Sequence, residues 1–197
     1  IQLRPAYWQA HNNLGILLHD AGKLDEAIAQ YHQAKQSSPD EPTIRNNLGN
    51  TYYDKGDYDS AVVEFNELFR MNPNWKAGHA GLAKVYIAKL DYQSAIPQLR
   101  LAILDNPTAS AEHRVLGQVL LATHQAEEGL RELRIAVELD PDSAIAHRLF
   151  GTALFESQRL PAASQEFREA LRRHPSAKND YFLAPCLISM GRDSEAL

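Results

Sequence analysis

Proline recurs at a fixed interval along the chain, and this interval constrains the fold more than any other feature of the sequence. Six of the ten prolines follow one another at spacings of 34 residues: Pro5, Pro39, Pro73, Pro107, Pro141 and Pro175. Chance placement would almost never give such a series. Histidine shows the same interval at His79, His113 and His147, with His11 two intervals before His79. A period of this length indicates tandem structural repeats that pack on one another.

Apolar and small residues recur at matched sites between the prolines. A Leu-Gly pair or a close variant occurs at Leu14-Gly15, Leu48-Gly49, Leu82-Ala83, Leu116-Gly117 and Phe150-Gly151. A small residue follows at Ala27, Ala61, Ala95, Gly129 and Ala163, and four residues later a large one at Tyr31, Phe65, Leu99, Leu133 and Phe167. Spacings of three and four residues place such side chains on one stripe of a helix. Each repeat therefore predicts two helices that bury their stripes together.

This period and these offsets resemble the tetratricopeptide repeat (TPR) family. The resemblance implies an all-α fold, a right-handed superhelical solenoid of antiparallel helix hairpins with a concave groove. Position 1 of each repeat is Trp8, Pro42, Lys76, Ser110 or Ala144. The expected boundaries are a single array with the tail of a preceding repeat at 1–7, full repeats at 8–41, 42–75, 76–109, 110–143 and 144–176, and a partial repeat at 177–197.

Helix ends are predicted from residues with special backbone or capping properties. Gly22, Gly56 and Gly191 stand where first helices should end in the left-handed conformation. Asp57 and Asp91 follow at sites that can cap second helices. Pro185 falls inside the first helix of the partial repeat, and we expect it to kink or shorten that helix.

The two ends of the array are expected to expose apolar faces that neighbouring repeats would otherwise cover. These faces would contain Tyr7 and Trp8 at one end and Leu187 and Leu197 at the other. A homo-oligomer formed through exposed terminal repeats is therefore one function that the pattern allows.

Composition argues against several other classes of protein. The net charge is −5 and no run of Lys or Arg exceeds two residues, so we expect neither nucleic acid nor a basic membrane anchor as a partner. No stretch approaches the roughly 18 apolar residues of a membrane span, which predicts no direct membrane insertion and a soluble protein of the cytoplasm or periplasm. The single cysteine, Cys186, allows no internal disulfide and is expected to be buried.

We find no catalytic motif, and expect neither an enzyme nor a cofactor. Phosphate loops, nucleophile elbows and zinc-binding spacings are all missing from the sequence. The four histidines at position 4 of their repeats cannot share a metal ion, because packed helices lie about 8–10 Å apart and metal–ligand bonds are about 2 Å long. We expect these histidines to pack between helices.

The resemblance implies that one side of the first helices lines the groove, at positions 2, 5, 6, 9 and 12. In the first two repeats the candidate partner-binding residues are Asn12, Asn13, Asn46, Asn47, Asn50 and Tyr53, whose amides can donate to and accept from a peptide backbone. Farther along they are Lys84, Ile87, Arg114, Gln118, Leu121, Arg148 and Phe155, which favour an acidic ligand with an apolar anchor. The alternative, that these residues only keep the surface solvated, stays open.

The leading hypothesis is a non-catalytic scaffold that binds a partner protein or an extended peptide. A second hypothesis is the substrate-selecting arm of a larger enzyme, because Asn13 and Asn47 hold the site of the asparagine ladder in the TPR arms of O-linked N-acetylglucosamine transferases. The ladder stops at Gly81. The clamp for acidic chaperone tails is excluded, since Ala77 and Gly81 stand where it needs Lys and Arg.

Overall fold

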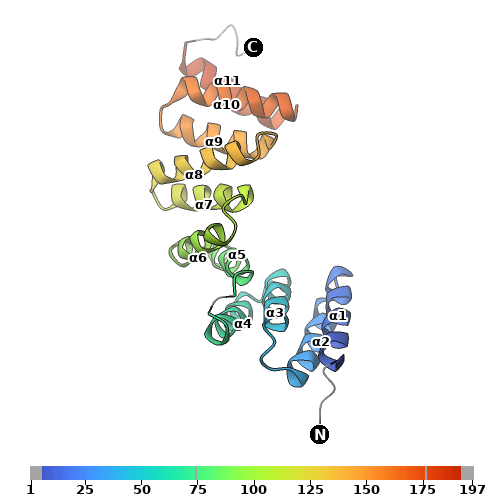
Figure 1. Cartoon of the computed structure of the whole chain (residues 1–197). Helices are drawn as coiled ribbons and strands as arrows, with labels where there is room; N and C mark the ends of the chain where they lie inside the picture. Colours follow the sequence, from blue (N-terminus) through green and yellow to red (C-terminus); the bar gives the residue numbers. More distant parts are fainter. Residues whose placement is uncertain (1–5, 74, 176, 192–197) are drawn as a thin grey trace. The chain divides into compact units, whose positions relative to one another are not determined.

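A computed structural model of the chain describes residues 6–73, 75–175 and 177–191 (Figure 1). All regular structure within these ranges is helical. The helices are α1 (Ala6–Asp20), α2 (Leu24–Ser37), α3 (Pro42–Lys55), α4 (Tyr58–Met71), α5 (Gly78–Ala88), α6 (Tyr92–Asp105), α7 (Ser110–Ala122), α8 (Ala126–Leu139), α9 (Ala144–Glu156), α10 (Leu160–Arg173) and α11 (Ala177–Ser189). The expectation of an all-α repeat fold is confirmed.

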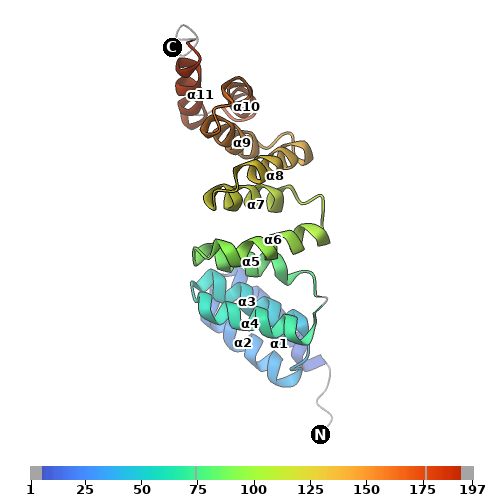
Figure 2. The same cartoon turned by 90° about the vertical axis from the view of Figure 1, so that its left-hand side faces the viewer.

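The helices belong to two compact units, unit 1 at Ile1–Ala102 and unit 2 at Ile103–Leu197. In unit 1, α1 pairs with α2 and α3 with α4, while α2 packs on α3 and α4 on α5. In unit 2, α7 pairs with α8 and α9 with α10, while α8 packs on α9 and α10 on α11. Figures 1 and 2 show the paired helices side by side from two directions. Each helix pair therefore packs on the pair that follows it in the same unit.

The predicted helix ends at glycine are confirmed. Gly22, Gly56 and Gly191 have φ of 74°, 83° and 70°, the left-handed region that glycine adopts most readily. The sequence did not predict the same turn in the other repeats, where it falls at equivalent positions on residues with a Cβ: Leu90 (φ 59°), His124 (φ 62°) and Gln158 (φ 59°). A left-handed non-glycine residue costs about 1–2 kcal/mol, so the surrounding helix pairs must stabilise these turns.

Aspartates cap the second helices as predicted. The Asp57 carboxylate accepts a hydrogen bond from the Ser60 backbone N–H at 3.2 Å, and Asp91 does the same for the Ser94 N–H at 3.1 Å. Both satisfy a backbone donor that has no partner within its helix. The hydrogen bonds from Ser60 lower the pKa of Asp57.

Close contact between paired helices depends on glycine or alanine opposite a large side chain. A Cβ on Gly49 would lie 2.8 Å from ring carbons of Phe65, which is fully buried. In unit 2, a Cβ on Gly117 would lie 2.7 Å from Cγ of Leu133 and 3.0 Å from the Gly129 carbonyl oxygen. Because such contacts are far shorter than the usual 3.5–4.0 Å between carbons, these sites exclude side chains.

Separate groups of buried side chains lie between successive helices. In unit 1, the first cluster contains Ala27, Ile28, Tyr31, Ala34, Ile44 and Leu48, and the second contains Ala61, Phe65, Leu68, Leu82 and Val85. In unit 2, a cluster contains Leu130, Leu133, Ala153, Leu154, Ala163, Phe167 and Cys186. Each cluster joins the second helix of one repeat to the first helix of the next.

Two expectations for the ends of the array were wrong. Pro185 does not end α11, which continues to Ser189, and Leu187 is only 1% exposed. The proline itself is exposed, so the carbonyl that loses its hydrogen bond can reach water instead. Tyr7 is 62% exposed, Trp8 is half-buried against the first cluster, and Leu197 lies outside the described residues.

Candidate functional site

The candidate site residues lie on the first helices, on the side away from their own second helix. In unit 1 these helices are α1, α3 and α5, and α3 contacts both others. In unit 2 they are α7, α9 and α11, and α9 contacts both others. We call these surfaces the first-helix face of unit 1 and the first-helix face of unit 2.

The asparagines of unit 1 divide into engaged and available side chains. Asn12 is only 5% exposed, which differs from its predicted place on an open surface, and its Oδ1 accepts a hydrogen bond from Nδ2 of Asn47 at 2.9 Å. Asn46 is half-buried with its Oδ1 enclosed and without a hydrogen-bond partner among the described residues. Asn13 is exposed and Asn50 is half-exposed. The outward amides are therefore chiefly those of Asn13 and Asn50.

A hollow of about 240 Å³ opens beside these amides on the first-helix face of unit 1. Three helices line it, with Ile16, His19, Tyr31, Asn47, Asn50 and Thr51. Burial raises the pKa of Tyr31 to about 12, so its hydroxyl stays protonated at neutral pH. His19 Nε2 lies 2.8 Å from Oδ2 of Asp54 at the edge of the hollow. The hollow thus combines apolar walls with hydrogen-bonding groups.

The remaining unit 1 candidates are less uniform. Tyr53 is half-buried, with its ring centroid 5.8 Å from that of Tyr58. Ile87 is half-exposed and Lys84 is exposed on α5. Gly81, on the same helix, has no space for a side chain, because a Cβ there would lie 2.6 Å from the Phe65 ring and 3.0 Å from Oδ1 of Asn50. Packing thus accounts for the glycine at this site of the predicted asparagine series.

The first-helix face of unit 2 carries two arginines on neighbouring helices. Arg114 on α7 and Arg148 on α9 are both half-buried, and the described residues give neither guanidinium a carboxylate partner. The Arg148 guanidinium carbon lies 5.7 Å from the ring centroid of Phe182 on α11. Gln118 is exposed on α7. This face therefore presents positive charge with unused hydrogen-bond donors.

Apolar side chains accompany these arginines. Leu121 on α7 and Phe155 on α9 are half-exposed and pack with their buried parts against the core cluster of unit 2. Both occupy position 12 of their repeats. Their exposed parts lie one helical turn or more beyond the arginines, so charge and apolar surface occupy the same face.

A recurring pair between the two helices of each repeat was missed in the sequence. Position 4 contacts a polar residue 19 positions later in all five repeats. His11 and His79 face Gln30 and Gln98 at 2.8 Å, Arg45 faces Glu64 at 3.0 Å, and His113 and His147 face Glu132 and Glu166 at 2.6 Å. Comparing position 4 with position 23 across the repeats, rather than each position with itself, would have revealed the pairs.

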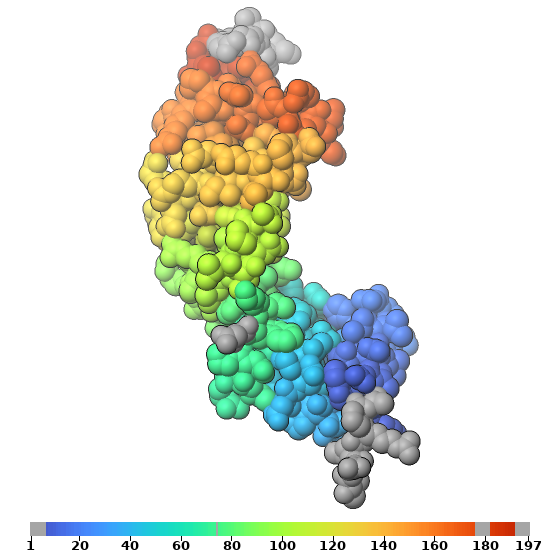
Figure 3. All heavy atoms as spheres, in the orientation of Figure 1, coloured from blue at the N-terminus to red at the C-terminus, as the bar shows by residue number. Residues whose placement is uncertain are grey.

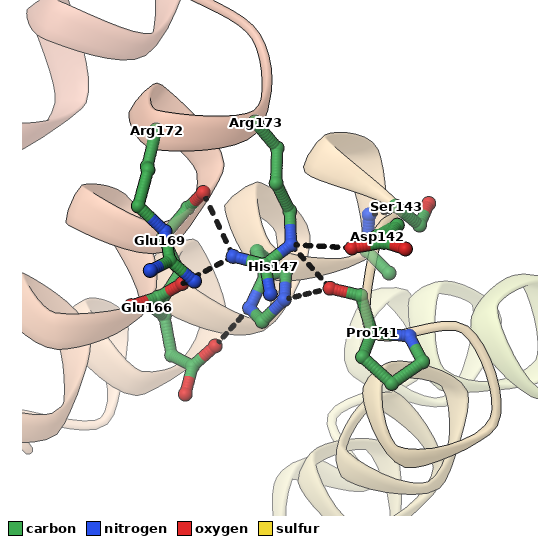
Figure 4. A network of polar contacts seen from close by, with 9 residues as sticks. Pro141, Asp142, Ser143, His147, Glu166, Glu169, Arg172 and Arg173 are labelled. Carbon is green, nitrogen blue, oxygen red and sulfur yellow. Dashed lines mark hydrogen bonds and ion pairs between the residues drawn. The ribbon is translucent and has the colours of Figure 1, made fainter.

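The pair in the last full repeat belongs to a larger network, shown in Figure 4. His147 Nδ1 contacts Glu166 of α10, while its Nε2 lies 3.0 Å from the Pro141 carbonyl oxygen in the loop before α9. Arg173 contacts the same carbonyl oxygen and Glu169, and its hydrogen bond lowers the pKa of Glu169. The network holds the first turn of α9 against α10, with its polar groups directed away from Arg148.

Neither a metal-binding cluster nor a membrane-spanning helix is found in the described ranges. No group of three or more His, Cys, Asp or Glu side chains there could hold an ion. None of the helices in those ranges combines the length and the apolar character that crossing a bilayer requires. Cys186 is fully buried as predicted, and its burial raises the pKa of the thiol.

Tandem antiparallel helix pairs, each stacked on the next with its first helices aligned, define an α-helical repeat protein. Comparison with known families identifies which repeat. Three TPR sequence models match the chain, a TPR repeat at residues 17–56 and tetratricopeptide repeats at 42–75 and 114–178. The chain belongs to the tetratricopeptide repeat family, whose members bind proteins or peptides.

Solved TPR structures share the fold at low sequence identity. Residues 41 to the end of MamA from Desulfovibrio magneticus RS-1 match with a TM-score of 0.81 at 20% identity, covering 87% of this chain and 97% of that chain. YrrB, described as a TPR protein with an unusual peptide-binding site, matches with 0.76 at 21%, covering 92% and 90%. PilF from Pseudomonas aeruginosa matches with 0.82 at 14%, covering 98% and 88%. The search of curated proteins gave no match.

Proposed function

We propose that the chain is a non-catalytic scaffold that binds an acidic segment of a partner protein along the first-helix face of unit 2. The observation that carries the proposal is the pair of half-buried arginines, Arg114 and Arg148, to which the described residues supply no carboxylate. A guanidinium presents a planar fork of donors that fits a carboxylate, and partial burial strengthens that interaction. A partner carboxylate would supply the missing acceptor.

Other arginines of unit 2 show that carboxylates are available where no ligand is needed. Arg134 contacts Glu138, Arg159 contacts Glu127, and Arg173 contacts Glu169. The two arginines of the first-helix face differ from these in having no such neighbour. A surface that only needed charge for solvation would gain nothing from leaving partly buried arginines without acceptors.

The apolar part of the face supplies an anchor. Leu121 and Phe155 are held by the unit 2 core, so little conformational entropy is lost when a ligand covers their exposed parts. Aromatic and arginine residues are the side chains that most often dominate binding energy at interfaces. The expected ligand is therefore a segment with Asp or Glu next to a large apolar residue.

Unit 1 offers a different chemistry to an extended chain. Asn50 and the 240 Å³ hollow present hydrogen-bonding groups and apolar walls rather than net charge. We propose that this face contacts peptide backbone and neutral side chains. YrrB, with its described peptide-binding site, gives a precedent for a peptide ligand in this fold.

The role of a substrate-selecting arm in a glycosyltransferase is less well supported. Its basis is the asparagine pair Asn13 and Asn47, but Nδ2 of Asn47 donates to Asn12 and is not available to a ligand in this arrangement. We therefore favour the scaffold, and no residue of the described ranges needs a catalytic role to account for its contacts.

Charge reversal of the two arginines tests the proposal. Fluorescence anisotropy would follow a labelled peptide in which Glu residues flank a single Phe, at about 50 mM and about 300 mM salt. We expect Arg114→Glu with Arg148→Glu to weaken binding roughly tenfold or more at low salt, and less at high salt. Circular dichroism should stay unchanged, because neither side chain supports a helix contact.

The matched control reverses two arginines on α8, Arg131→Glu with Arg134→Glu, which changes the net charge equally. Binding by this control should match that of the natural chain. If the control weakens binding as much as the first-helix variant does, general charge attraction accounts for binding and the proposed face does not. Failure of the natural chain to bind the Glu-Phe peptide better than a Lys-Phe peptide would also refute the acidic ligand.

A further inference from the structure

Helix α1 carries an apolar stripe that no described residue covers. Tyr7, Leu14 and Leu17 are 62%, 44% and 66% exposed, and Ala10 between them is exposed as well. Spacings of three and four residues place the four on one side of the helix. Figure 3 shows α1, in dark blue, at the outer edge of unit 1. Leaving this much apolar side chain in water is unfavourable.

The same repeat positions are buried wherever a preceding repeat is described in the same unit. In α3 the equivalents of Ala10, Leu14 and Leu17 are Ile44, Leu48 and Thr51, which are 0%, 0% and 1% exposed. In α5 the equivalents of the two leucines are Leu82 and Val85, at 1% and 0%. In α9 the equivalent of Leu17 is Ala153, at 1%. The exposure in α1 therefore reflects a missing neighbour and not a different design of the helix.

The second helix of the preceding repeat provides this cover. Ile44 and Leu48 share one buried cluster with Ala27, Ile28, Tyr31 and Ala34 of α2. Leu82 and Val85 share another with Ala61, Phe65 and Leu68 of α4. The covering helix thus offers a repeating set of small and large apolar residues to the stripe of the next first helix.

We propose that the stripe of Tyr7, Ala10, Leu14 and Leu17 is a stacking surface for the second helix of one further TPR repeat, encoded directly before Ile1 in the same protein. The repeat period locates that helix. Shifting residues 27–34 back by 34 places their equivalents immediately before Ile1, and Pro5 then holds the place of Pro39, which lies between α2 and α3. The covering helix would need no additional linker.

A second copy of the chain is a poorer occupant. The second helices α2, α4, α8 and α10 each have this stacking side packed against the first helix that follows. At the other end, α11 is a first helix, with Leu187 buried and Phe182 stacked on Phe167 at 5.8 Å between centroids. Among these helices a second copy has no free face of the matching kind. The inference does not depend on the ligand proposed for the first-helix faces.

The experiment uses the full-length protein and compares Leu17→Glu with Ile16→Glu. Ile16 is a matched control because it is also an exposed apolar residue of α1, at 39%, but faces the hollow and not the stripe. We expect Leu17→Glu to increase amide hydrogen exchange in α1 roughly tenfold or more, and Ile16→Glu to change it little. If Leu17→Glu prevents folding, Leu17→Ala against Ile16→Ala should show the same order with a smaller difference.

Sedimentation velocity distinguishes the occupants. Unchanged mass together with faster exchange in α1 supports the preceding repeat. Dissociation of a dimer by Leu17→Glu would identify a second copy and overturn the proposal. Equal effects of the two glutamates would show that the stripe is uncovered, with the same consequence. The residues before Ile1 must also show small residues at the equivalents of Ala27 and Ala34 and a large apolar one at that of Tyr31.

Discussion

The contact between Gly49 and Phe65 leads to a prediction in which two destabilising substitutions compensate each other. Repeat 2 combines glycine with an aromatic ring at these sites, whereas repeat 3 combines Ala83 with Leu99, both buried. We expect Gly49→Ala and Phe65→Leu each to destabilise unit 1. The double variant, which reproduces the pair of repeat 3, should be more stable than the sum of the two changes allows.

The magnitudes follow from the geometry. A Cβ on Gly49 would lie 2.8 Å from Cε2 and Cζ of Phe65, so overpacking should cost about 1–3 kcal/mol. Removing a glycine from a helix interior returns about 1 kcal/mol, which leaves a net loss of about 1 kcal/mol. Phe65→Leu should cost about 1–2 kcal/mol, less than the about 3–5 kcal/mol of a Phe→Ala truncation. In the double variant the new methyl group occupies part of the space that the ring leaves, and the coupling should be about 1–2 kcal/mol.

Urea denaturation followed by tryptophan fluorescence measures this cycle. Trp75 packs against the cluster that contains Phe65 and reports on it directly. Replacing Trp8 by Phe in every variant leaves Trp75 as the single tryptophan, since the chain has two. A local reporter is needed because repeat proteins can unfold in parts.

A second cycle with Gly49→Ala and Phe69→Leu provides the control. Phe69 stacks on His79 at 4.4 Å between centroids and is not among the atoms near Gly49. The free-energy changes of this control pair should therefore add. Additive effects in the Phe65 cycle, or a double variant less stable than the sum, would refute the reasoning from ring and backbone packing.

Two further predictions concern polar groups of unit 1. Glu64 is 7% exposed and contacts both Lys35 at 2.7 Å and Arg45 at 3.0 Å, so Glu64→Gln should cost about 3 kcal/mol or more in urea denaturation; a loss below about 1 kcal/mol, typical of exposed pairs, would contradict it. Asp57→Ala should cost about 1 kcal/mol at neutral pH through loss of the cap. Because hydrogen bonds from Ser60 lower the pKa of folded Asp57, its charge-linked stability is present above the unfolded value of about 3.9 and is lost as the pH falls through the folded pKa. In an acid titration of stability, Asp57→Asn should keep most of the cap and lose this pH dependence; an unchanged pH dependence in that variant would contradict the assignment.

The repeat architecture could be predicted because each of its determinants is local and recurs. Gly22 and Gly56 mark helix ends, and Ala27 and Ala61 mark the close approach of paired helices. A single occurrence of any of these would be ambiguous. Repetition at one interval removes the ambiguity, since the same physical requirement applies in each repeat.

The burial of individual polar side chains could not be predicted in this way. Asn12 and Arg114 both occupy position 5, yet the former is buried against Asn47 and the latter is half-exposed. The difference arises from the neighbouring first helix, whose residue at position 6 is an asparagine in one case and Leu149 in the other. Position within a repeat defines the direction of a side chain, but its environment depends on residues one period away.

Prolines within helices show a similar limit of sequence rules. Pro97 lies inside α6 and Pro185 inside α11, and both helices continue past them. Both prolines are exposed. A buried proline would leave an unsatisfied carbonyl in the core, but on an exposed side that carbonyl can bond water. The rule that proline ends a helix therefore needs burial as a second condition.

Adjacent residues in one repeat separate folding from binding. His147 at position 4 turns inward to Glu166 and the Pro141 carbonyl, whereas Arg148 at position 5 turns outward without a carboxylate. Inward positions are constrained by a partner 19 residues away, and the pairs His–Gln, Arg–Glu and His–Glu all satisfy that constraint. Outward positions have no such requirement and can change without loss of the repeat. Amides can thus predominate on one unit and arginines on the other, and we infer that ligand preference in this chain depends on the outward set alone.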